Sequence, residues 1–313
     1  MGVIFIVSTE KAVGKTAICA GLATNFLNDG KKVGYLKLEV SEKSGPDSDI
    51  AFMNQTLGPD GIVDTANPTK GRDIVLVESY LGPSSDDAVS RATFKAAKEM
   101  KAKAIAVEAY SGETSPFLDI YRVFGANLLG VVINKVPGSQ LKRVRDEVKA
   151  RFEAAGIKVL GVIPENRILL AITVGEIAEN LQGKILNSAE KSVDLVEDYM
   201  LGAMVVDSGL EYFGRKSRKA AIIRHDRPDM QLAALETSTA CLVLSGSTDK
   251  PPVYNVLYKA ESRGIPIIAT GAAINDIVTI IEGTLLKSRF NQPNKLVKMA
   301  EAVKQNLDIK ALS

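Results

Sequence analysis

Short apolar runs recur along the first half of the chain, and each is followed by a stretch with helical periodicity. The runs are apolar throughout rather than alternating, as expected for strands that are buried on both faces of a parallel sheet. Strands that alternate with helices predict an α/β fold in three layers. The six predicted strands cover residues 3–7, 33–38, 74–77, 104–107, 128–133 and 159–163.

The second half repeats this pattern on a smaller scale. It contains apolar runs at 220–223, 241–244 and 265–269, separated by helical patterns at 230–236, 253–262 and 274–282. The periodicity fades between residues 183 and 190, where Gly, Asn and Ser appear. We therefore expect a first domain at 1–187 that ends with a helix over 171–180, a second, smaller α/β domain at 188–290, and an amphipathic C-terminal helix within 291–313.

Composition and charge narrow the classes of function. The chain has 313 residues, of which 46% are apolar and 24% charged, values typical of a folded globular protein. A formal charge of +2 gives no general attraction to nucleic acid or anionic lipid, so neither is an expected partner. The apolar run near the start is far shorter than the ~20 residues of a membrane span, so we expect a cytoplasmic protein. Cys19, Cys241 and a single histidine provide neither a disulfide framework nor a zinc cluster, and both cysteines should lie in the core.

The segment after the first strand, S-T-E-K-A-V-G-K-T, has the features of a phosphate-binding loop. Gly14 permits close approach of the backbone, Lys15 supplies a cation for the β and γ phosphates, and Thr16 offers a hydroxyl to magnesium. A helix that begins near Lys15 would direct its positive end at the phosphates. The consensus loop has Gly where this chain has Thr9. The competing interpretation is a strand-to-helix turn that binds no nucleotide.

Charged residues at the ends of two other strands could complete this site. Glu78 ends the third strand, and ligands of open α/β sheets lie at the carboxyl ends of strands, so Glu78 is either a magnesium ligand or a solvated loop residue. Lys37 ends the second strand, where its amine either meets an anion, such as a substrate carboxylate or γ-phosphate, or extends to the surface. Of Asp47 and Asp49, one is expected to cap the next helix, and Asp49 is the preferred metal ligand.

The ends of the fifth and sixth strands are candidates for contacts to the nucleoside. Asn134 can donate to and accept from a purine edge at once, although it could also occupy a simple turn. Pro164 and Glu165 follow the sixth strand and would flank the base or ribose.

These residues resemble a known family. The motifs V-G-K-T, V-L-V-E at 75–78, V-I-N at 132–134 and G-V-I-P at 161–164 are similar to those of dethiobiotin synthetase, and closer still to the amino-terminal domain of long bacterial phosphotransacetylases. The resemblance covers about residues 1–183 and implies a P-loop NTPase-like fold, ATP and Mg²⁺ as cofactors, and a homodimer. It implies that Lys15 and Lys37 contact phosphate or substrate, that Gly14, Lys15, Thr16 and Ala17 bind the nucleotide with Asn134 and Pro164, and that Thr16, Asp49 and Glu78 hold magnesium.

The second half is similar to the DRTGG domain. The resemblance runs from about residue 198 to 283, through H-D-R-P-D at 225–229 and L-V-L-S-G at 242–246. Asp226 and Arg227 are retained from the naming motif, in a loop that leaves a predicted strand. Arg227 could bind an anion there. Alternatively, Asp226 pairs with Arg227 or caps the following helix, and His225 is a loop residue.

Three functions are consistent with these features. The first, which we favour, is a nucleotide-responsive regulatory protein that binds ATP with Mg²⁺ in one domain and senses or transmits through the other. The second is an ATP-dependent synthetase or ligase that activates a small carboxylate or carbamate by phosphoryl transfer. The third is a scaffold that has lost its ligand. Thr9 in the loop and the short segment after Lys37 differ from dethiobiotin synthetase and favour the first function.

Overall fold

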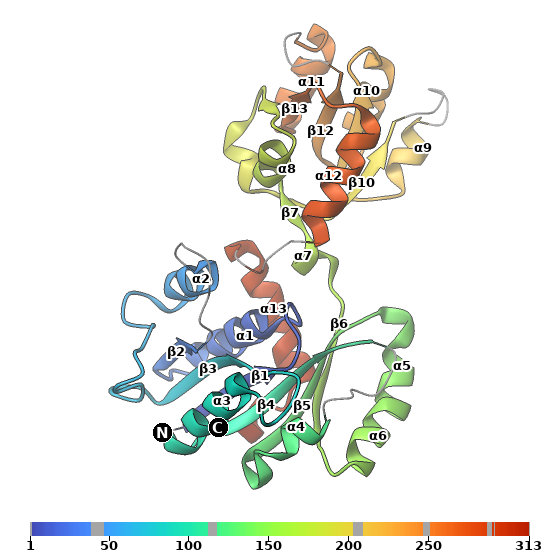
Figure 1. Ribbon diagram of the computed structural model, residues 1–313. Coiled ribbons are helices and arrows are strands. Elements are labelled where there is room, and N and C mark those ends of the chain that lie inside the picture. Colours follow the sequence, from blue (N-terminus) through green and yellow to red (C-terminus); the bar gives the residue numbers. More distant parts are fainter. Residues whose placement is uncertain are drawn as a thin grey trace. The chain divides into compact units, whose positions relative to one another are not determined.

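The computed structural model describes residues 2–38, 47–111, 118–202, 209–246, 251–286, 290 and 292–312. The chain forms two compact units (Figure 1). The first contains Met1–Leu169 together with Phe290–Ser313, and the second contains Leu170–Arg289. The second unit is therefore an insertion, because the chain returns to the first unit with its last segment.

The first unit is built on one parallel sheet of six strands in the order β2-β3-β1-β4-β5-β6. Each predicted strand of the first half lies in this sheet, which confirms the three-layer α/β prediction. Their bounds are β1 (Gly2–Ser8), β2 (Val33–Lys37), β3 (Ile74–Tyr80), β4 (Lys103–Ala109), β5 (Leu128–Val136) and β6 (Val159–Pro164).

Helices cover both faces of this sheet. Along β1, Ile4 and Ile6 face the core under α1, α2 and α13, whereas Phe5 and Val7 face the core under α3, α4 and α6. This explains why the strands are apolar throughout. The helices are α1 (Lys15–Asn28), α2 (Ser48–Leu57), α3 (Ala88–Glu99), α4 (Leu118–Arg122), α5 (Leu141–Arg143), α6 (Lys149–Ala154), α7 (Arg167–Leu170) and α13 (Pro293–Asn306).

The C-terminal helix α13 is an integral part of the first unit and lies along α1 (Figure 1). A Cβ atom on Gly21 of α1 would lie 2.7 Å from Val303 Cγ2, so glycine permits the close approach of the two helices. The Asn25 side chain of α1 donates to the Ala300 carbonyl at 2.9 Å. Beyond α13, Leu307 forms an antiparallel bridge to Gly161 of β6.

The second unit contains a five-stranded sheet in the order β10-β11-β12-β13-β8, in which only β8 is antiparallel. The three predicted strands correspond to β11, β12 and β13. Strand β8 has only two residues, and β10 begins with Asp198 and Tyr199, so neither forms an apolar run. Helices α9, α10 and α11 cover one face, and α8 and α12 cover the other. The elements are β7 (Ile172–Thr173), α8 (Val174–Asn180), β8 (Lys184–Ile185), β9 (Leu195–Val196), β10 (Asp198–Leu201), α9 (Gly209–Gly214), β11 (Lys219–Arg224), α10 (Pro228–Leu235), β12 (Thr239–Ser245), α11 (Tyr254–Arg263), β13 (Ile267–Thr270) and α12 (Ile274–Leu286).

The division between the units differs from the boundary expected at residues 187 and 188. Helix α8, expected as the last helix of the first domain, packs Val174 and Ile177 into the core of the second unit, beside Ile277 of α12. Strand β8 likewise pairs with β13. An apolar helix face does not specify which core it joins, so tertiary packing decides the division. In the described parts of the chain, no helix has the length and apolar character needed to cross a membrane.

Candidate functional site

The loop between β1 and α1 leads into the helix through Gly14. Gly14 is the N-cap of α1 and has φ +99°, and a Cβ there would lie 2.5 Å from Asn134 Nδ2. Glycine is required on both grounds, because L side chains avoid this backbone region and the space is taken. No side chain caps α1, and no acidic residue lies in its first turn. The positive end of the helix is therefore suited to an anion.

Lys15 lies at the mouth of this loop and is only 6% exposed. Its Nζ donates to the Ser8 hydroxyl at 2.9 Å, and that hydroxyl donates to the Glu10 carbonyl at 2.6 Å. The ammonium also lies 5.6 Å from the centre of the Tyr80 ring. The charge of Lys15 opposes the effect of burial on the pKa of Glu78, so this cation acts at the same place as the predicted magnesium ligands.

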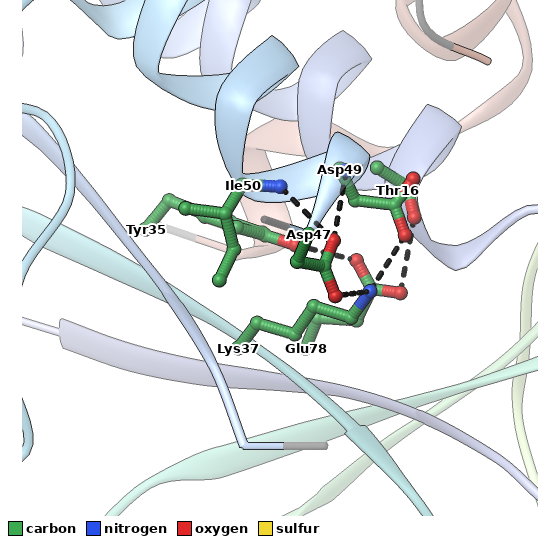
Figure 2. Close-up of polar contacts among 7 residues, drawn as sticks. All are labelled: Thr16, Tyr35, Lys37, Asp47, Asp49, Ile50 and Glu78. Carbon is green, nitrogen blue, oxygen red and sulfur yellow. Dashed lines mark hydrogen bonds and ion pairs between the residues drawn. The ribbon is translucent and has the colours of Figure 1, made fainter. Parts of the chain in front are cut away.

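Glu78 joins the phosphate loop helix to the sheet (Figure 2). The Thr16 hydroxyl donates to Glu78 Oε1 at 3.1 Å, and the Tyr35 hydroxyl donates to Glu78 Oε2 at 2.8 Å. The structure therefore brings together Thr16 and Glu78, as expected, and adds Tyr35 from β2. Glu78 is buried rather than solvated. Burial raises the pKa of its carboxyl to about 7, against the opposing effects of Lys15 and the Tyr35 hydrogen bond.

Lys37 forms ion pairs with two aspartates of the chain itself. Its Nζ donates to Asp49 Oδ2 at 2.6 Å and to Asp47 Oδ2 at 2.9 Å (Figure 2). Burial alone would lower the pKa of Lys37, but the hydrogen bonds from its ammonium to the two carboxylates raise it. Asp47 is the N-cap of α2 and accepts from the backbone N–H groups of Asp49 and Ile50, which confirms that one of the two aspartates caps a helix. The Lys37 side chain is 7% exposed, so it does not extend into solvent.

The residues present fit a magnesium ion that is shared with a polyphosphate. The hydroxyl of Thr16 and the carboxylate of Glu78 are the oxygen ligands that Mg²⁺ prefers, and Mg²⁺ is commonly held by one or two protein groups together with phosphates and waters. Asp49 is engaged by Lys37 and would need to exchange partners to join them. Within the described ranges, no group of three His, Cys, Asp or Glu side chains could hold a metal ion alone. Thr16 and Glu78 thus fit a magnesium ion that takes its remaining ligands from phosphates and waters.

The end of β5 supports the phosphate loop from the other side. Asn134 Nδ2 donates to the Val13 carbonyl at 2.8 Å, and Lys135 Nζ donates to the Ala12 carbonyl at 2.7 Å. Burial lowers the pKa of Lys135. Pro164, at the end of β6, is paired with Val136. Asn134 thus holds the loop, and its contact with a nucleobase stays a prediction.

Sequence reasoning missed four polar residues around the loop. Tyr35 contacts the predicted site residue Glu78, and Lys135 contacts the loop at the Ala12 carbonyl. Glu108 and Tyr121 form a pair on β4 and α4. Glu108 had a signal, since it follows the apolar run of β4 as Glu78 follows that of β3. Tyr35 and Tyr121 had no such signal, because the residues around a tyrosine in the sequence do not show whether its hydroxyl bonds to a distant carboxylate.

In the second unit, Asp226 and Arg227 each form an ion pair with another residue. Arg224 donates to Asp226, and Arg227 donates to both oxygens of Asp229, with Nη2 at 2.8 Å from Oδ2. Arg227 is the N-cap residue of α10, which has no side-chain cap, so Asp226 does not cap it. The helix-capping role of Asp226 is therefore wrong. Cys19 and Cys241 are fully buried, as expected, and burial raises the pKa of both thiols.

An open hollow of about 660 Å³ lies elsewhere on the first unit. It is lined by Lys32, Asp60, Asn67 and Arg72, among others. Lys32 and Arg72 precede β2 and β3, so the hollow lies at the amino ends of these strands, opposite the phosphate loop. It is not part of the candidate site.

Two family matches cover most of the chain. Residues 4–173 match the CobQ/CobB/MinD/ParA nucleotide binding domain, and residues 176–284 match the DRTGG domain. The matches meet close to the structural division at Leu169 and Leu170.

Individual proteins are similar to all or part of this chain at low identity. The phosphate acetyltransferase of Haemophilus influenzae is 23% identical over 300 residues, which cover 78% of this chain and 42% of the relative. The chain thus spans less than half of that relative's length. The MinD cell division protein of Aquifex aeolicus is 20% identical with a TM-score of 0.38, over 54% of this chain and 85% of that one. The CBS and DRTGG domains of the regulatory region of Clostridium perfringens pyrophosphatase, complexed with its activator diadenosine tetraphosphate, are 17% identical with a TM-score of 0.31, over 47% of this chain and 71% of that one.

Proposed function

Because the chain belongs to the CobQ/CobB/MinD/ParA nucleotide binding family, and carries a DRTGG domain after it, we propose that it is a nucleotide-responsive regulatory protein. In this proposal the first unit binds ATP with Mg²⁺, and the second unit senses a ligand or transmits the nucleotide state.

The observation that carries the proposal is the position of Lys15 at the head of α1. A buried ammonium, an uncapped helix N-terminus and the Thr16 hydroxyl converge at the end of β1, each suited to part of a magnesium triphosphate. Lys15 and the helix end would neutralise the phosphates, and Thr16 with Glu78 would hold the ion. When bound, the ion would add positive charge against the phosphate oxygens.

The state of Lys37 supports regulation over catalysis. Rapid phosphoryl transfer depends on cations that neutralise the transferred group. The Lys37 ammonium is held by Asp47 and Asp49, which already neutralise its charge. A protein of this kind can bind ATP and change state with slow turnover or none.

Calorimetric titration of ATP with Mg²⁺ tests the proposal. We expect binding to the wild type and a loss of affinity of about 10- to 100-fold in Lys15→Ala, as for the removal of a charged hydrogen-bonding group. Lys11→Ala is the matched control, because Lys11 lies in the same loop with its side chain exposed, and it should bind nearly as the wild type does. A wild type that binds no nucleoside triphosphate, or a Lys11→Ala variant that fails as Lys15→Ala does, would contradict the proposed site.

A second candidate is a ligase that activates a small carboxylate or carbamate. The observation in its favour is the register of β2 and β3, which sets Lys37 beside Glu78 and so brings a second cation to the same edge of the sheet. Release of phosphate from ATP separates the two functions. A ligase should release phosphate faster when its carboxylate substrate is added, whereas the regulatory protein should show no such stimulation by a panel of small carboxylates.

A further inference from the structure

Two buried glutamate–tyrosine pairs flank the strand that leads into the phosphate loop. Strand β1 lies between β3 and β4 in the sheet. Glu78 of β3 accepts from the Tyr35 hydroxyl, and Glu108 of β4 accepts from the Tyr121 hydroxyl. Tyr35 packs in the core under α1 and α2, whereas Tyr121 packs in the core on the opposite face. The proposed function uses the first pair and leaves the second without a role.

The second pair, Glu108 and Tyr121, contacts Thr9, the first residue after β1. The Tyr121 hydroxyl lies 3.5 Å from the hydroxyl of Thr9. All three side chains are at most 9% exposed, with Tyr121 fully buried. They come from the end of β4, from α4 and from the loop itself, so the contact ties three segments together.

Thr9 occupies the position at which the consensus loop has glycine. The Glu108–Tyr121 pair explains why a threonine is suitable there. A buried threonine hydroxyl must be hydrogen-bonded, since an unsatisfied buried group costs about 1–3 kcal/mol. Tyr121 provides the partner, and Glu108 orients the tyrosine by accepting a hydrogen bond from its hydroxyl. Glycine at position 9 would leave the loop entrance more mobile, whereas threonine can bond to Tyr121 and fix it.

We propose that Glu108 and Tyr121 are positioning residues that hold Thr9, and with it the entrance of the phosphate loop, in the conformation that accepts the nucleotide. Neither residue touches the nucleotide. They act through Thr9, by keeping the loop backbone preorganised so that binding does not spend free energy on ordering it. This inference rests on the proposed nucleotide site.

Tyr121→Phe tests the positioning role, because it removes one hydroxyl and keeps the buried ring. We expect the dissociation constant for ATP with Mg²⁺ to rise about tenfold, in line with one lost hydrogen bond to a charged acceptor. Tyr110→Phe is the matched control, since Tyr110 donates to Gln140 at 3.3 Å in the same unit and does not contact Thr9. It should leave the dissociation constant within about twofold. If Tyr121→Phe binds as tightly as Tyr110→Phe, the positioning role is wrong.

Substitutions of Glu108 supply the second readout. Glu108→Gln keeps an oxygen that accepts from Tyr121 and should bind within about twofold of the wild type, whereas Glu108→Leu should match Tyr121→Phe. Combined with Tyr121→Phe, Glu108→Leu should add little further loss, because both changes break one chain of contacts. Additive losses, or a Glu108→Gln variant as weak as Glu108→Leu, would overturn the proposal. Failure of the wild type to bind would instead refute the nucleotide site itself, so the two failures are distinguishable.

Discussion

Thr16 on α1 donates its hydroxyl hydrogen to Glu78 on β3 across 3.1 Å, although the two residues are 62 positions apart in the sequence. The contact exists because β1 and β3 are adjacent and parallel, so that the start of the helix after β1 meets the end of β3. Together with the hydrogen bond from Tyr35, it fixes the orientation of a buried carboxylate. Several measurable properties of the protein depend on this arrangement.

The stability of the protein should depend on the ionisation of Glu78. Its pKa is about 7 in the folded protein, against 4.5 for an ordinary glutamate, so the folded state binds more protons between these values. The contribution of Glu78 to stability is therefore fully present below about pH 4.5 and is lost as the pH rises to about 7. The loss should amount to about 3 kcal/mol at most. Urea unfolding from pH 5 to 8 should show a smaller fall in stability for Glu78→Gln than for the wild type. Equal slopes would show that the carboxyl titrates normally.

Gly14→Ala should impair nucleotide binding more than a backbone effect explains. Both Gly14 and Gly30 have positive φ, +99° and +77°, but only at Gly14 would a Cβ meet another residue, Asn134. Both alanine variants should lose about 1 kcal/mol of stability through backbone strain. Only Gly14→Ala should displace Asn134 and weaken binding of ATP, by about tenfold or more as measured by calorimetry. Similar binding by the two variants would mean that the space at Gly14 is not needed.

Lys37→Met should leave Asp47 and Asp49 without their cation. Since the ammonium is largely buried between them, we expect a loss of about 1–3 kcal/mol in unfolding free energy. Millimolar Mg²⁺ should restore part of this loss, because a divalent cation can replace the ammonium. Lys95→Met is the control, because the Lys95–Glu99 pair is exposed and should contribute less than about 0.5 kcal/mol. Melting temperatures with and without Mg²⁺ provide the measurement, and equal effects of the two substitutions would contradict it.

The contribution of the contact between α1 and α13 to stability should be measurable by substitution of Asn25. Its Nδ2 donates to the Gly21 carbonyl on its own helix and to the Ala300 carbonyl on α13. Asn25→Ala should cost about 1–3 kcal/mol, because a buried contact between helices is lost. Asn306→Ala removes a bond only to Ala302 on its own helix and should cost less than about 0.5 kcal/mol. Chemical unfolding followed by the tyrosine signal compares them. A small effect of Asn25→Ala would show that the cross-helix contact adds little.

The sequence by itself determined the elements whose signals are local. The six apolar strands of the first sheet, Gly14, Lys15 and Thr16 at the head of α1, and Glu78 at a strand end could all be predicted, because an apolar run, a glycine with positive φ and a strand-end carboxylate are each recognisable within a few residues. The rule that ligands lie at the carboxyl ends of parallel strands then joined Thr16 to Glu78 before any contact was known.

Tertiary structure alone decided which partners the remaining side chains take. Lys37 was expected to meet a ligand or solvent, yet it lies between Asp47 and Asp49. Tyr121 reaches Glu108 and Thr9 from a different layer, α8 joins the second core, and α13 returns across the whole insertion to α1. The physical reason is common to all four. The sequence shows that an apolar face must be buried and that a buried polar group needs a hydrogen-bond partner. Which segment provides that partner depends on how distant parts of the chain pack together.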